Sequence, residues 1–219
     1  AGSVINDNGV LNVDKRNNFN SNVNLNRYTL RTNIIVNVSK TTEVIARMSG
    51  SFDDYSGPMD GGAAVFKEVM ATNPVLFPPY YEPDEANQNT QHILFGNYDQ
   101  GQYHNPYAGM VRGYKHYTTA QMLAQFELDQ KLDFITQGLA FNALFNTSRY
   151  SHFSVGRNYK PFFYEVAKYE KKTDTYTLSK PINETDGTEY LGYHEGGKDI
   201  TSTTYFESRL NWYRNFNEK

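Results

Sequence analysis

The chain of 219 residues has 21 basic and 24 acidic side chains, so its net charge of −3 gives no basic footprint for nucleic acid. Because it has no Cys, disulfides, thiolate metal sites and cysteine nucleophiles are excluded. No apolar run is long enough for a transmembrane helix. The mean hydropathy of −0.69 still permits membrane-spanning strands, because their residues alternate between lipid and lumen.

The first predicted element pair is a β-hairpin. Residues 12–26 are rich in Asn and predict a polar loop or the end of a strand. Apolar and polar residues then alternate over Arg27–Val38 and again over Thr42–Asp54, with the polar stretch Ser39–Thr41 between them. Two alternating runs joined by a short polar turn are typical of a hairpin.

The same alternation recurs in three later runs, Thr118–Gln130, Gly138–Tyr150 and Thr204–Phe216, the first two joined by a short connection at Leu132–Gln137. Each run has about 12 residues, roughly twice the usual strand of a soluble sheet. A tilted strand needs about 9–11 residues to cross a membrane. Run length therefore favours the wall of a barrel over a sandwich.

The remaining connections are long. Residues 55–117 and 151–203 separate the runs, which is unusual in a compact soluble domain. The first contains an apolar stretch, Ala63–Ala71, that predicts a short helix ended by Asn73-Pro74. The second predicts a small hairpin turning at Lys171–Asp174. Short turns on one side and long loops on the other are typical of outer-membrane barrels, with the short turns in the periplasm.

Shared parity within the runs predicts which side chains face lipid, since the opposite parity is polar. The predicted set is Tyr28, Leu30, Ile34, Val36, Val44, Met48, Phe52, Met122, Phe126, Leu128, Phe141, Phe145, Phe206, Leu210 and Trp212.

No motif supports catalysis. The five His lack the spacing of a zinc site, and no GxSxG, P-loop or GxGxxG motif is present, so we expect neither an enzyme nor a cofactor. Asp53, Asp54 and Asp60 form an acidic cluster around a Gly-Pro turn. Such oxygen-rich loops bind Ca²⁺ or simply form turns, and the sequence leaves both interpretations open.

The loops are unusually rich in aromatic residues interleaved with Asn, Gln and Gly. They are Phe77, Tyr80, Tyr81, Phe95, Tyr98, Tyr103, Tyr107, Tyr114 and Tyr117. A Tyr ring suits stacking on sugars or packing against a partner protein, but large loops also need aromatics to fold on themselves.

Six segments carry a specific resemblance. They are RYTLRTNIIVNVSKTTEV, FDDYSGPMDGG, ATNPVLFPPYY, HILFGNY, NPYAGMVRGY and LAQFELDQKLDFITQGL. In order and context they resemble the barrel of the SusC/RagA-type TonB-dependent transporters of Bacteroidetes. The likeness covers most of residues 9–216.

That resemblance implies an all-β fold: residues 1–219 would be part of one antiparallel transmembrane β-barrel domain, 22-stranded in the family. Its long extracellular loops would carry the short helix and the small hairpin. It also implies the outer membrane of a Gram-negative cell, uptake of oligosaccharides or peptides, a SusD-like surface lipoprotein as a lid, and energy from the TonB complex. The plug and remaining strands of such a transporter are not in this sequence, so we expect a segment of a longer protein.

We expect loop 55–117 to contribute to the cargo chamber and to the seat of the lid. Its candidate contacts are Tyr80, Tyr81, Tyr103 and Tyr107, and the candidates in the wall below are Arg47, Asp53 and Gln121. The alternative is a soluble β-rich glycan-binding module. The two interpretations differ in whether the apolar face meets lipid or a second sheet.

Overall fold

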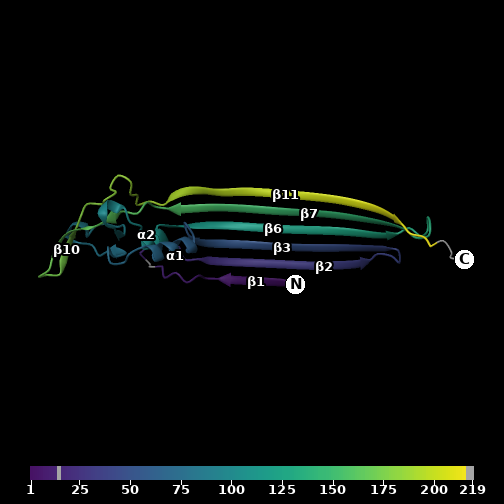
Figure 1. Cartoon of the computed structure of the whole chain (residues 1–219), viewed down its shortest axis with the longest axis horizontal. Coiled ribbons are helices and arrows are strands. Elements are labelled where there is room, and N and C mark those ends of the chain that lie inside the picture. Colours follow the sequence, from purple (N-terminus) through teal and green to yellow (C-terminus); the bar gives the residue numbers. More distant parts are fainter. Residues whose placement is uncertain (14–15, 216–219) are drawn as a thin grey trace.

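The structure is a computed structural model that describes residues 1–13 and 16–215. The chain is all-β, with one long antiparallel sheet of order β1-β2-β3-β6-β7-β11 (Figure 1). Its strands are β1 Gly2–Asp7, β2 Asn24–Asn37, β3 Thr42–Pro58, β6 Gly113–Lys131, β7 Leu139–Asn158 and β11 Gly192–Trp212. The sheet is open, since β1 and β11 have no strand on their outer sides among the described residues.

Both predicted hairpin turns are confirmed. β2 pairs with β3 across residues 38–41, and β6 pairs with β7 across residues 132–138. Gly138 ends the second turn with φ 78, where a Cβ would lie 1.7 Å from the carbonyl oxygen of Tyr213. Only glycine fits that position. The Tyr213 N–H also donates to the Gly138 carbonyl at 2.9 Å, which joins the turn to the end of β11.

The strands are longer than the alternation predicts. β6, β7 and β11 have 19, 20 and 21 residues, and β11 begins at Gly192 rather than Thr204. The early part of β11 lacks apolar alternation and contains a β-bulge between Glu195 and Lys198, so periodicity alone cannot reveal it. β1 was not predicted from the sequence either. Two predictions extend beyond the described residues: the last predicted strand ends at Phe216, and the Asn-rich stretch 12–26 contains Asp14 and Lys15.

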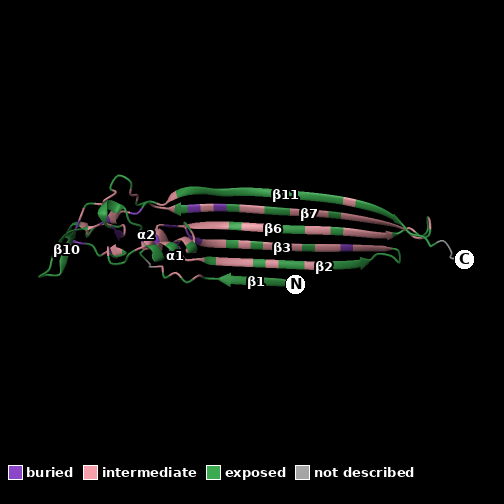
Figure 2. Cartoon of the chain, in the orientation of Figure 1, coloured by how far each residue is buried: buried purple, intermediate pink, exposed green. Residues whose placement is uncertain are grey.

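The strand register puts the whole predicted lipid-facing set on one face of the sheet, which we call the apolar face. Directly paired residues of neighbouring strands share a face. One such row runs Ile34–Ala46–Phe126–Phe145–Phe206, and another runs Tyr28–Phe52–Ala120. Large side chains on this face stay exposed, for example Leu30 at 62% and Phe206 at 65%. No second sheet covers it within the described part of the chain (Figure 2).

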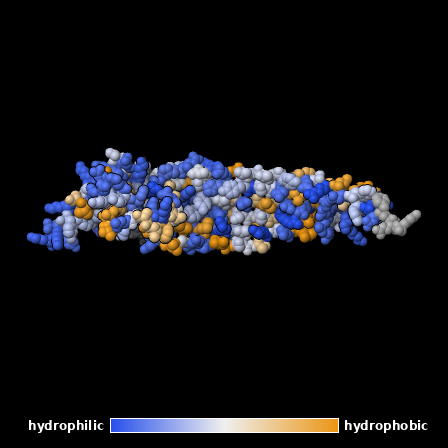
Figure 3. All heavy atoms as spheres, in the orientation of Figure 1, coloured by the Kyte–Doolittle hydropathy of each residue, from blue (hydrophilic) through white to orange (hydrophobic). Residues whose placement is uncertain are grey.

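The opposite parity forms the polar face, on which Arg47, Asp53 and Gln121 lie. A few apolar side chains such as Ile45 and Leu144 interrupt it. Figure 3 shows the surface from one side, where groups of hydrophobic residues alternate with hydrophilic ones along the sheet.

All the long connections lie at one end of the sheet, and the short turns lie at the other (Figure 1). We call residues 59–112 and 159–191 the loop cap. Its elements are α1 Gly62–Ala71, β4 Tyr80–Tyr81, the 3₁₀ turns Glu85–Asn87 and Asp99–Gly101, β5 Leu94–Gly96, α2 Pro106–Val111, β8 Phe163–Tyr164, β9 Val166–Glu170 and β10 Thr175–Leu178. The predicted short helix and small hairpin are thus confirmed as α1 and β9–β10. No helix of the described residues has the length and apolar character needed to cross a membrane.

Candidate functional site

The polar face is built from side chains that pair with each other across strands. Arg27 on β2 donates two hydrogen bonds to Asp53 on β3, Nε to Oδ1 and Nη2 to Oδ2, both at 2.7 Å. Closer to the short turns, Arg47 pairs with Glu127, which also accepts from Gln125. Two candidate wall residues, Arg47 and Asp53, are therefore engaged in ion pairs. The third, Gln121, is exposed.

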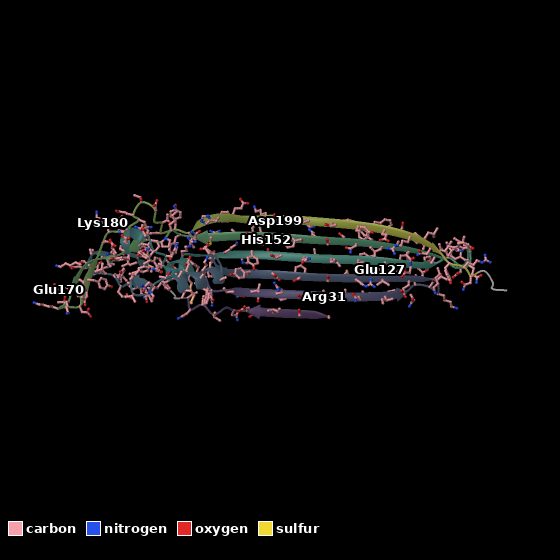
Figure 4. The ribbon with its side chains drawn as sticks, in the orientation of Figure 1. Arg31, Glu127, His152, Glu170, Lys180 and Asp199 are labelled. Atoms are coloured by element: carbon pink, nitrogen blue, oxygen red, sulfur yellow. The ribbon has the colours of Figure 1, made fainter. Side chains whose placement is uncertain are left out.

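The polar face also contains a hollow of about 340 Å³ near the short turns. Asn142 donates to Asp129, and Asn211 donates to Asn142 at 2.7 Å. Glu207 on β11 accepts from Arg209 and from the Tyr205 hydroxyl. A surface of this kind suits contact with water or with a polar ligand. Figure 4 labels Arg31, Glu127, His152 and Asp199, all on this face, with His152 and Asp199 paired in register on neighbouring strands.

The loop cap is folded around its own small cores. One buries Leu94, Tyr164 and Leu178, and the other buries Phe95, Ala108 and Val111. A short parallel pairing of β5 with β8 ties the two long connections together. The cap therefore holds a defined shape by packing, in the way that the sequence anticipates for loops rich in aromatics.

Asn105 is a polar connector inside the loop cap, with only 5% of its surface exposed. Its Nδ2 donates to the carbonyl oxygens of Pro79 and Gly96, both at 2.8 Å. Its Oδ1 accepts from the Ala108 N–H at 3.0 Å and so caps the first turn of α2. One side chain thus holds three segments together.

Asp84 has a similar role on the other side of the cap. Its carboxylate accepts from the Leu178 N–H at 2.8 Å and from the Asn87 N–H at 3.1 Å. Burial acts to raise the pKa of Asp84, but hydrogen bonds from Leu178 and Asn87 outweigh it and lower the pKa below its ordinary value. The ionised carboxylate therefore stabilises the cap.

Buried tyrosines complete this framework. Burial, followed by the negative charges of Glu189, Asp84 and Glu184, raises the pKa of Tyr164 to about 12. The Tyr164 hydroxyl lies 2.8 Å from Nε2 of His92, whose Nδ1 lies 2.7 Å from Glu189. Tyr164 is therefore a neutral phenol at neutral pH, and it serves as a hydrogen-bonding group.

The four tyrosine candidates lie in different surroundings. The Tyr80 ring stacks against the Arg16 guanidinium at 3.7 Å and lies 5.4 Å from the Tyr107 ring. Tyr81 packs against the cluster of Leu94, and Tyr107 packs against the cluster of Phe95. Tyr103 differs, because 41% of it is exposed.

Tyr103 also borders a hollow of about 510 Å³ beside α1, which we call the α1 hollow. Its polar lining consists of Asp60, Lys67, Glu68, Thr72, Gln102 and His104. Carboxylates, an ammonium and an amide around one exposed ring can hydrogen-bond and stack on a polar ligand. An apolar groove of about 360 Å³ lies next to it, lined by residues that include Val69, Phe77 and Met110.

Asp53, Asp54 and Asp60 do not converge. Asp53 pairs with Arg27, Asp54 lies 3.4 Å from His116, and Asp60 pairs with Arg112 at 2.5 Å. Adjacent strand residues point to opposite faces, which separates Asp53 from Asp54. Across residues 1–13 and 16–215, no group of three or more His, Asp or Glu side chains is arranged to hold a metal ion.

In comparisons with known proteins, no family model, no curated protein and no solved structure matches the chain. The site therefore rests on geometry. Sequence reasoning found Tyr103 but missed Lys67, Glu68 and His104, because they are ordinary polar residues that only the folded loop brings together.

Proposed function

We propose that the chain is part of the β-barrel of an outer-membrane, TonB-dependent transporter of the SusC/RagA type. In this proposal it imports oligosaccharides or peptides with a SusD-like lipoprotein as its lid, and the TonB complex supplies energy through other parts of the protein. The observation that carries the proposal is the two-faced sheet. Its apolar face is uncovered and its polar face is densely paired.

The apolar face favours lipid over water as its surroundings. Side chains such as Leu30, Ile34, Leu210 and Trp212 are 47–66% exposed. Soluble monomers rarely expose contiguous apolar patches of this extent. A glycan-binding sandwich would cover this face with a second sheet, and the described residues contain none in that position.

The apolar band has the height of a bilayer. From Asn37 at the short turn to Tyr28, β2 runs ten residues before Asn26 interrupts the face. From Leu139 to the first charge on this face of β7, Arg149, the count is eleven. Both counts match the roughly 9–11 residues of a tilted membrane-spanning strand.

The upper edge of the band runs obliquely to the strands. Arg149 pairs in register with Met122, and through it with Gly50 and Leu30, two residues nearer the turns than the row of Tyr28 and Phe52. An oblique edge is expected where strands tilt about 35–45° to the membrane normal. The rest of each long strand then stands above the bilayer and carries the loop cap on the cell surface.

The loop cap supplies the candidate contacts for cargo and lid. The α1 hollow offers one exposed ring among charged and amide groups, and the groove beside it offers apolar packing. Arg47, Asp53 and Gln121 line the polar face below, where a lumen would lie. Such a combination suits a polar ligand with some flat apolar surface, as in sugars and peptides.

The test uses the complete protein that contains this segment, expressed in a Gram-negative host. We expect it in the outer-membrane fraction, soluble only in detergent, and running faster on SDS gels before boiling than after. Protease added to intact cells should cut within 59–112 or 159–191 and spare the turns at 38–41 and 132–138. A protein that purifies without detergent would favour the soluble glycan-binding module instead. Cleavage confined to the short turns would contradict the orientation.

A further inference from the structure

The apolar face contains a hollow of about 470 Å³ at its upper edge, which we call the edge hollow. Its floor is formed by two small residues, Ala120 on β6 and Ser151 on β7, which pair in register. In the same row, Tyr28 and Phe52 stand on one side and Ile200 on the other, and Phe153 stands next along β7 towards the loop cap. The depression therefore lies where two small residues stand between larger ones on the apolar face.

The edge hollow spans a change in polarity. Towards the short turns it continues into the apolar band that we assign to lipid. Towards the loop cap it ends at Asp54, Thr118 and Lys198. An occupant that contacts both ends must be amphipathic, with an apolar part directed at the membrane and a polar part directed at the cell surface.

Two cations flank this hollow. Lys198 lines it, with its Nζ 5.9 Å from the centre of the Phe153 ring. Its ion pair with Glu195 is exposed at both side chains and therefore holds it only weakly. Arg149 lies on the same face of β7, two residues from Ser151, and is exposed. Within the described part of the chain, Arg149 forms no ion pair.

A charged side chain on a lipid-facing surface is costly unless an anion or water compensates it. Arg149 projects from the apolar face beside Met122 and Ser202, neither of which provides an acidic partner. Lys198 pairs in register with Phe153 on β7. Phe153 is four positions from Arg149 on the same strand, so the two cations lie about 13 Å apart along the strand direction. Two long cationic side chains can approach one phosphate from the two ends of such an interval.

We propose that the edge hollow binds one molecule of an anionic membrane lipid, with its phosphate between Arg149 and Lys198. Its acyl chains lie against Tyr28, Phe52 and Ala120. This proposal rests on the membrane placement proposed above. It adds a lipid site on the outer wall of the barrel, distinct from the cargo and lid contacts of the loop cap.

The test measures retained lipid by native mass spectrometry of the complete, detergent-purified protein titrated with phosphatidylglycerol or phosphatidylcholine. We expect one phosphatidylglycerol molecule to bind in preference to phosphatidylcholine. Arg149→Gln with Lys198→Gln should lower the affinity for phosphatidylglycerol about 25-fold, since each cation near a membrane contributes roughly a fivefold gain. Ser151→Trp should remove the bound lipid by filling the floor of the hollow.

Two control variants match these changes. Thr147→Trp adds the same ring to the same face of β7 outside the hollow, and Arg31→Gln removes a cation from the opposite face. Both should bind phosphatidylglycerol as the wild type does. Assembly of each variant is first checked by its faster migration on SDS gels before boiling. If Ser151→Trp does not assemble, the double charge variant tests the site, because it adds no bulk to the hollow.

Equal binding of both lipids by the wild type, or unchanged binding in the double charge variant, would overturn the lipid site while leaving the transporter proposal intact. Displacement by inorganic phosphate would assign the cations to a free anion and would also overturn it. A protein that fractionates without detergent would instead refute the membrane placement, and the lipid site with it.

Discussion

The sheet and the loop cap treat apolar side chains in opposite ways. The cap buries Leu94, Phe95 and Tyr164 to 2% exposure or less, although it is small and irregular. The sheet is large and regular, yet it leaves Leu30 and Phe206 more than half exposed. Because hydrophobic burial is the main favourable term in folding, this contrast indicates two different surroundings within one chain. The cap buries its apolar side chains within itself, and the apolar face of the sheet leaves them uncovered, which is why we propose that this face meets lipid.

The largest effect that breaks this contrast is a charge on the apolar face. If the apolar face meets lipid as proposed, Ile34→Arg should cost about 2–4 kcal/mol of stability, because Ile34 lies near the middle of the apolar band and the charge would have to enter hydrocarbon. The measurement is urea unfolding of the complete protein in lipid vesicles. Ile35→Arg, the same substitution at the adjacent residue on the polar face, is the matched control and should cost well under half as much. Equal costs for the two variants would show that the two faces meet the same medium.

Within the cap, the largest effect should come from its buried polar connector. Asn105→Ala removes the cap of α2 and leaves the carbonyls of Pro79 and Gly96 without a donor. The expected cost is about 1–3 kcal/mol of cap stability, measured by hydrogen exchange of the Ala108 amide. Gln102 is an exposed amide in the same loop, and Gln102→Ala should change the free energy of opening measured at the Ala108 amide by less than about 0.5 kcal/mol. Barrel assembly should be unaffected by either change if the cap and sheet are separate stability units.

A smaller effect should appear as a pH dependence confined to the cap. The pKa of Asp84 is lowered in the folded state, so its stabilising contribution is fully present above the unfolded value near 4 and is lost as pH falls through the folded value. Hydrogen exchange of the Leu178 amide, corrected for its intrinsic pH dependence, should therefore accelerate below about pH 4. Asp84→Asn should remove this dependence, and Asp99→Asn, an exposed carboxylate, should retain it. A wild-type cap whose opening is independent of acid would contradict this role for Asp84.

Sequence periodicity was sufficient to predict the hairpins, the parity of the apolar face, α1 and the β9–β10 hairpin, because these depend on local alternation and turn chemistry. It was insufficient for the first half of β11. There GYHEGGKDITST has no apolar alternation, and pairing with β7 alone holds the strand. β1 was missed because a segment of six residues, Gly2–Asp7, carries too little pattern.

The sequence predicted which type of residue would form the candidate site, but not which individual residues come together. Aromatic richness indicated where contacts would gather, but the parallel pairing of β5 with β8 joins residues 68 positions apart, as in Phe95 and Phe163. No local pattern records such a pairing. The sequence therefore offered Tyr80, Tyr81, Tyr103 and Tyr107 as equals, and their different surroundings depend on the assembled cap.

The last and smallest effect on stability separates these four tyrosines by what they do. Tyr80, Tyr81 and Tyr107 pack within the cap, so we expect them to hold its folded shape. Tyr103→Ala should change cap stability by less than about 0.5 kcal/mol, because much of its ring is exposed.

If the α1 hollow takes part in cargo binding, the same Tyr103→Ala change should nevertheless weaken uptake or lid binding. Loss of one stacking face corresponds to about 0.5–1.5 kcal/mol, or roughly a two- to tenfold loss of affinity. The matched control is Tyr190→Ala, since Tyr190 is 72% exposed in the other long connection and does not border the hollow. Barrel assembly, co-purification of the lid and cargo uptake are measured separately in the complete protein. Wild-type values for all three in Tyr103→Ala would make the hollow a surface feature without a ligand. A loss confined to lid binding or uptake would show that Tyr103 in the loop cap takes part in recognition.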